Sequence, residues 1–104
     1  MPVVLITGAP LASDDATRAM LAAVNGAVAA GLGLKPSDVY SAASPTTTAL
    51  LGDEAVTPWP VAVVYGSARA PERMAAALDG LRSALVSAWE CPPHAVWAQW
   101  VVSS

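Results

Sequence analysis

The sequence consists of two similar halves, and this repeat limits the possible folds more than any other feature. Three pairs of segments correspond: residues 2–8 with 60–66, 20–26 with 74–80, and 39–41 with 96–98. The offset drifts along the chain, as expected when loops gain insertions while the elements between them are kept. We interpret the pattern as a duplicated β-α-β unit, with copies at about 2–44 and 60–102.

The length and composition predict one domain that associates with other copies. A chain of 104 residues is too short for two independent cores, so residues 1–104 form a single domain in which the two halves share a core. Charged residues make up 12% and hydrophobic residues 55%, which leaves less polar covering than a small monomer carries. We therefore expect an oligomer.

Several classes of partner are disfavoured by the same composition. Five basic and eight acidic residues give a net charge of −3, and the basic residues are scattered, so no nucleic-acid surface is expected. No apolar run approaches the roughly 18 residues that span a bilayer, and Gly8 and Pro10 interrupt the apolar start before it resembles a targeting signal. A single Cys91 suits a reducing cytoplasm, which is the expected location.

Local signals place two helices and four strands. Ser13 is a good N-cap for a first helix, Asp14 and Asp15 complement its dipole, and Gly31 and Gly33 end it. A second helix runs from Pro71 to about Trp89, where Cys91-Pro92-Pro93 stops it. Strands are expected at about 2–7, 39–43, 61–65 and 95–101.

Two right-handed β-α-β crossovers predict an α+β fold: a four-stranded mixed sheet with both helices on one face. The other face is apolar too, and we expect it to pack against further copies of the chain. Residues 44–59 are expected to form either a functional lid or a disordered loop, with a short helical turn around residues 49–51.

The Met1-Pro2 start, the duplicated unit and the length together resemble the tautomerase superfamily. The likeness covers nearly the whole chain and is greatest to the two-unit branch that includes macrophage migration inhibitory factor. The resemblance implies a homotrimer and a catalytic N-terminal proline, Pro2, exposed when Met1 is removed. It implies no cofactor and no metal. A lone His94 after Pro93 agrees, since no partner has metal-ligand spacing.

Other site residues are implied by the same resemblance. Gly33-Leu34-Lys35-Pro36 resembles the Gly-Lys-Pro after the first helix of that branch, which makes Lys35 a substrate-binding residue. Tyr65 takes the place of an apolar pocket wall. Val96-Trp97-Ala98-Gln99 resembles its fourth-strand Val-Tyr-x-Asn, which gives Trp97 and Gln99 to the pocket.

The segment Gly66-Ser67-Ala68-Arg69, followed by Arg73, resembles the arginine loop of cis-3-chloroacrylic acid dehalogenase and malonate semialdehyde decarboxylase. Arginines of that loop hold the substrate carboxylate, which implies this role for Arg69 and Arg73. Two departures argue against dehalogenation. Ala9 stands where short tautomerases carry an arginine, and no segment after Ser104 supplies the dehalogenase's catalytic acid.

The expected chemistry is proton transfer on a small anionic keto or enol acid. An α-amino group has a pKa of roughly 7.7 to 8.0, and an apolar pocket or nearby cations such as Lys35 and Arg69 lower it. Such an amine can move a proton between oxygen and the carbon beside a carbonyl, which is keto-enol tautomerisation.

Each assignment has a structural alternative. Pro2 can simply begin an edge strand, Lys35 can be a solvated turn residue, and Arg73 a solvated helix charge. Of Trp97 and Trp100, one is expected to face a pocket or interface and the other the opposite side of the sheet. A non-catalytic oligomeric binding protein is the second functional hypothesis. Leu5–Ala9 also resembles the first turn of short-chain dehydrogenases, but Pro10–Ser13 lacks the glycines that phosphate binding requires.

Overall fold

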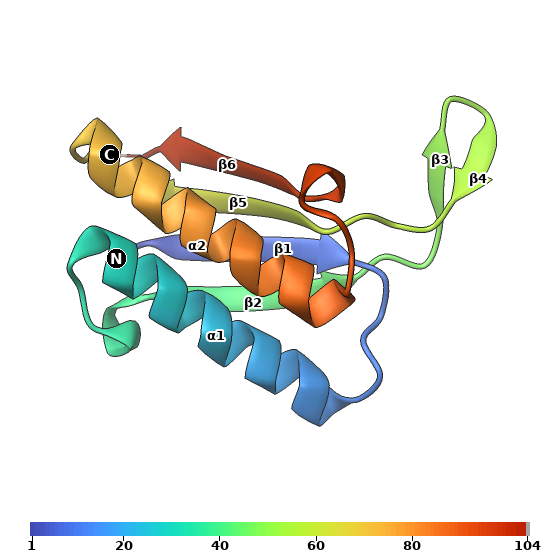
Figure 1. The fold of residues 1–104 in the computed structure, drawn as a ribbon, viewed down its shortest axis with the longest axis horizontal. Coiled ribbons are helices and arrows are strands. Elements are labelled where there is room, and N and C mark those ends of the chain that lie inside the picture. The colour runs from blue at the N-terminus through green and yellow to red at the C-terminus, as the bar shows by residue number, and fades with distance from the viewer. Residues whose placement is uncertain (104) are drawn as a thin grey trace.

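A four-stranded sheet with two helices on one face forms the body of the computed structural model, which describes residues 1–103 (Figure 1). The strands are β1 (Val3–Gly8), β2 (Tyr40–Pro45), β5 (Val61–Gly66) and β6 (Trp97–Val102), in the order β2-β1-β5-β6. The helices are α1 (Asp14–Leu32) and α2 (Pro71–Trp89), which pack on each other. The fold predicted from the sequence is confirmed.

The duplication is visible in the sheet. Within each half the strands are parallel, β1 with β2 and β5 with β6, and the two halves meet antiparallel at β1 and β5. Equivalent hydrogen bonds recur: Tyr40 N–H donates to the Pro2 carbonyl and Trp97 N–H to the Pro60 carbonyl, both at 3.0 Å. The antiparallel contact places the start of each half beside the end of the other half's first strand.

Both helices begin and end where the sequence signals place them, and α2 runs from Pro71 to Trp89 as predicted. Ser13 Oγ accepts a hydrogen bond from Ala16 N–H at 3.1 Å, and Gly33 adopts a φ of 72° after the last turn. These caps were predicted. The N-cap of α2 is Ala70, which has no capping side chain, and its C-cap Glu90 has a φ of 51°.

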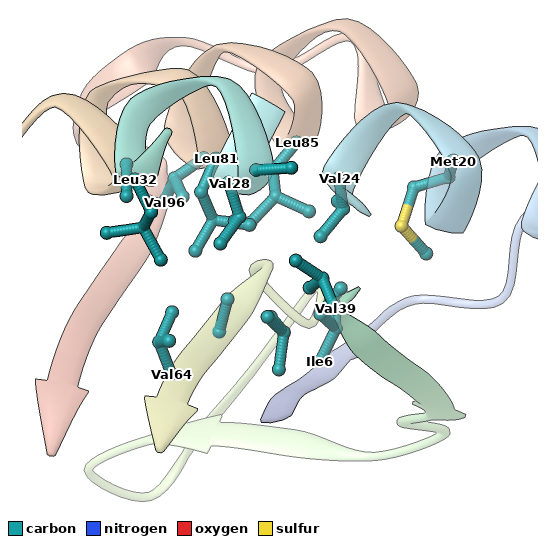
Figure 2. Packing of buried hydrophobic residues seen from close by; sticks show 14 residues of the cluster. Ile6, Met20, Val24, Val28, Leu32, Val39, Val64, Leu81, Leu85 and Val96 are labelled. Atoms are coloured by element: carbon teal, nitrogen blue, oxygen red, sulfur yellow. The ribbon is translucent and has the colours of Figure 1, made fainter. Parts of the chain in front are cut away.

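The core lies between the helices and the covered face of the sheet (Figure 2). Alternate strand residues such as Ile6 and Val64 point toward α1 and α2, whose buried stripes include Val28 and Leu81. Burying apolar side chains of this size stabilises a fold by about 1.5 to 3 kcal/mol each, which explains why two half-units can share one small core.

The segment between the halves is a β-hairpin. Strands β3 (Ala49–Leu51) and β4 (Glu54–Val56) pair antiparallel and project away from the main sheet (Figure 1). The helical turn expected around residues 49–51 is therefore wrong. Gly52 at a φ of 64° begins a two-residue turn with Asp53, a position where tight hairpins require positive φ.

The sheet face opposite the helices is open and largely apolar. The register places one set of side chains from all four strands on this face, and they include Tyr40, Leu5, Tyr65 and Trp97. Trp97 is 62% exposed and Tyr40 55%. An apolar surface of this kind marks an interaction site, in agreement with the predicted oligomer.

The remaining elements are the short 3₁₀ turns Pro36–Asp38 and Pro93–Ala95. His94 lies exposed in the 3₁₀ turn Pro93–Ala95, and Cys91 packs partly buried against the core. Among residues 1–103 no group of acidic, histidine and cysteine side chains is arranged to hold a metal ion. None of the described helices is long and apolar enough to cross a membrane.

Candidate active site

Pro2 lies at the start of β1 in a buried position. Its side chain is almost fully buried and its carbonyl accepts the Tyr40 N–H, while Met1 is 82% exposed. Gly66 is its neighbour across the sheet, since a Cβ at Gly66 would lie 3.8 Å from the Pro2 Cα. Pro2 therefore lies where the start of β1 meets the end of β5, and it is bonded to the exposed Met1.

Two of the predicted binding residues, Tyr65 and Lys35, belong to this same end of the sheet. Tyr65 pairs with Val3, next to Pro2, and projects from the open face with 37% exposure. Lys35 lies between α1 and β2, exposed, with its backbone N–H bonded to the Asp38 carboxylate at 3.1 Å. Because β1 and β2 are parallel, the loop that feeds β2 reaches the sheet at the Pro2 end.

Arg69 also lies at this end, in the loop from Gly66 to α2. Its side chain is partly buried, and its Nε atom is buried without a hydrogen-bond partner. A guanidinium is always charged near neutral pH, so a buried unpaired N–H of this group is a strong site for an anion.

Arg73 makes a different contact. Its Nη1 donates to the Leu32 carbonyl at 2.9 Å, and Gly33 leaves room for it, since a Cβ there would lie 2.7 Å from the same nitrogen. The contact joins the first turn of α2 to the last turn of α1. A cation at a helix C-terminus is stabilising, which gives Arg73 a structural role besides any contact with substrate.

Trp97 and Gln99 do not come near Pro2 within one chain. Trp97 pairs with Val61, five residues along β5 from Gly66, which corresponds to roughly 17 Å of strand. Gln99 lies on the same open face, and its side-chain oxygen accepts the Trp97 indole N–H at 3.4 Å. Any contact between these residues and a proline site requires a second copy of the chain.

Trp100 was not among the predicted site residues, yet it lies close to Pro2. It points toward the helices, so the two tryptophans face opposite sides of the sheet, as predicted. Its Cζ2 lies 3.1 Å from the position of a Cβ at Gly66, and its indole nitrogen is buried without a partner. The strand period places Trp97 and Trp100 on opposite faces of the sheet. The contact between Trp100 and Gly66 depends on the pairing of β5 with β6.

A concave cavity lies at the other end of β1. It encloses about 450 Å³ between Gly8–Asp14, the end of β2 and Trp89 of α2. The Trp89 indole donates to the Ala9 carbonyl at 2.8 Å, which fixes the ring as one wall. No residue that the sequence assigned to the site lines this cavity.

Neither a protein-family model nor a curated protein matches this sequence. Solved structures match closely in backbone. A symmetric trimer of fused 4-OT is 16% identical with a TM-score of 0.86, covering 97% of this chain and 85% of that one. MIF2 of Leishmania major is 21% identical with a TM-score of 0.78, covering 99% and 89%.

Malonate semialdehyde decarboxylase, whose structure is described as a basis for decarboxylase and hydratase activities, is 18% identical with a TM-score of 0.75, covering 98% of this chain and 84% of that one. The chain therefore has the tautomerase fold, as the sequence predicted. The backbone agreement is higher with fused 4-OT than with MIF2, so the likeness extends beyond the branch that the sequence motifs resemble.

Proposed function

We propose that the chain, once Met1 is removed, is a tautomerase that uses the Pro2 amine as general base on a small 2-oxo acid. The observation that carries this proposal is the position of Pro2: a buried ring bonded to the exposed Met1, at the end of the sheet that also carries Arg69 and Lys35. The proposal is supported by the structural likeness to fused 4-OT and to malonate semialdehyde decarboxylase, which is an enzyme.

The proton transfer needs only this chain's own groups. The neutral Pro2 nitrogen takes the proton of the enol hydroxyl, and the resulting ammonium returns a proton to the adjacent carbon, so the enol acid becomes the keto acid. Nothing is oxidised or reduced. Arg69 and Lys35 offset the charge on the oxygen and hold the carboxylate, which lowers the barrier electrostatically.

Removing Met1 is a chemical requirement of this mechanism. While Met1 is attached, the Pro2 nitrogen is part of an amide and has no basic lone pair. Because Met1 projects into solvent, its loss opens the nitrogen without disturbing the buried ring. The activity should therefore depend on processing and not on refolding.

We further propose that the working unit is a homotrimer. The apolar open face needs a cover, and the fused 4-OT neighbour is a symmetric trimer. In such an assembly Trp97 and Gln99 of one chain are free to line the Pro2 site of the next, because both lie exposed on the open face. Light scattering at micromolar concentration is expected to give three chains, and a clean monomer would refute this.

The proposed activity is tested by comparing Met-free and Met-retaining protein, separated and checked by intact mass. The substrate is phenylenolpyruvate, followed by the loss of its enol absorbance. We expect turnover from the Met-free form alone, with the same circular dichroism for both forms. Equal turnover by the two forms would exclude Pro2 as the base, and no turnover by either form would favour a non-catalytic binding protein.

A further inference from the structure

Two buried N–H donors at the Pro2 end have no acceptor. They are Nε of Arg69 and the indole Nε1 of Trp100, and no described residue accepts from either. Folded chains pair nearly all buried donors, because an unpaired one costs the free energy of its desolvation. Two in one region indicate a group that the chain itself does not supply.

Both donors are placed by the end of β5. The Trp100 ring lies against Gly66, with Cζ2 at 3.1 Å from a Cβ built there, and Arg69 follows Gly66 by three residues. The same glycine is the neighbour of Pro2 at 3.8 Å. Gly66 therefore borders both the proposed base and the Trp100 ring, and a larger residue there would crowd the ring.

The beginning of α2 strengthens the case for an anion. No side chain caps this helix at Ala70, whereas Ser13 caps α1 and two aspartates follow it. An uncapped helix N-terminus carries partial positive charge, and Arg69 directly precedes it. The negative group that α1 supplies from its own sequence is largely missing at α2, where Glu72 is the only acid of the first turn.

We propose that Trp100 Nε1 and Arg69 Nε together bind the carboxylate of the 2-oxo acid, which makes Trp100 a substrate-binding residue. This inference rests on the proposed function for the identity of the anion. A carboxylate has two oxygens and accepts from two donors at once, and both bonds are strengthened when the donors are buried. The indole N–H cannot bind a cation, so the pair selects acids.

The test is a titration of Met-retaining, ¹⁵N-labelled protein, in which the four tryptophan indole N–H signals are followed by NMR. The ligand is oxamate, a 2-oxo acid mimic with no carbon-bound proton to transfer, at constant ionic strength. Uncharged ethyl oxamate is the matched control. We expect oxamate to shift the Trp100 signal downfield and saturably, and ethyl oxamate to leave it in place.

Trp89 is an internal control, because its indole N–H is already bonded to Ala9 and should not move. Trp100→Phe assigns the signal and removes the N–H while keeping an aromatic ring. It should weaken oxamate binding about tenfold, and Arg69→Gln by about ten- to a hundredfold. Unchanged dispersion of the remaining amide signals shows that each variant is folded.

A Trp100 signal that stays in place at high oxamate overturns the proposal, and so does a folded Trp100→Phe variant that binds oxamate as well as the parent. Because the titration needs no turnover, its result is independent of Pro2 catalysis. An inactive Met-free enzyme whose Trp100 signal still responds would refute the tautomerase and keep the anion site.

Discussion

The two ends of the sheet are related by the internal repeat, and they have diverged in what occupies the same place. At one end stand Pro2, Gly66 and the buried donors of Arg69 and Trp100. At the other end Gly8 takes the place of Gly66, and a tryptophan again lies against the glycine, but this one is Trp89 from a helix.

The difference lies in how the two indoles are satisfied. Trp89 donates to Ala9 within the chain and walls a cavity without any cation among its lining residues. Trp100 has no acceptor and shares its end with Arg69. The indole of one end is satisfied within the chain, and the indole of the other end is not.

The largest effect that separates the two ends should come from their prolines. Pro2→Ala, after Met1 removal, keeps a primary amine in place of the secondary one and should lose most of the tautomerase turnover, on the scale of about 10²-fold or more for a displaced general base, with a shifted pH profile. Pro60→Ala should leave the pH profile unchanged, because the Pro60 nitrogen is an amide. A shifted profile for Pro60→Ala would contradict the assignment of chemistry to one end.

The next effect concerns the two glycines. Gly8→Ala would bring a Cβ to 2.8 Å from a Trp89 ring carbon, while the equivalent approach at Gly66 is 3.1 Å. Overpacking of this kind costs about 1 to 3 kcal/mol, and the Trp89 ring is held by its hydrogen bond, so Gly8→Ala should destabilise more than Gly66→Ala. Urea unfolding of both variants measures this. Gly26→Ala is a control with open space at the Cβ position.

The smallest effect sharpens the comparison of the two indoles. Trp89→Phe removes a satisfied hydrogen bond and should lower the free energy of unfolding by about 1 to 2 kcal/mol. Trp100→Phe removes a donor that has no partner in the free protein, so it should cost less or nothing. Equal losses in chemical denaturation would mean that Trp100 is bonded in solution.

Much of this architecture could be predicted from local signals. The repeat fixed the pairing of halves, Ser13 and Gly33 marked the ends of α1, and the strand period separated Trp97 from Trp100. These features depend on neighbours in sequence, where propensity and capping act. The hairpin was not predicted because Leu51-Gly52-Asp53-Glu54 lies in a segment rich in proline and threonine. Several residues there favour turns, so Gly52 did not stand out as the centre of a hairpin.

The site was harder to predict than the fold, because its members meet only through the sheet register. Arg69 could be suspected from its loop, but the contact of Trp100 with Gly66 follows from pairing between β5 and β6. The bond from Arg73 to Leu32 joins residues 41 positions apart. The separation of Trp97 from Pro2 likewise depends on which strand residues are paired, which no local pattern specifies.

The covalent link between the halves reduces the number of prolines that can become free amines. Pro60 begins its half as Pro2 does, but Trp59 is bonded to its nitrogen, so each chain has one proline that can become a free amine where two separate half-units would have two. Joining the units thus removes half of the potential bases. Under the proposed function, the end that begins with Pro60 carries no reactive amine, so its side chains can serve packing alone.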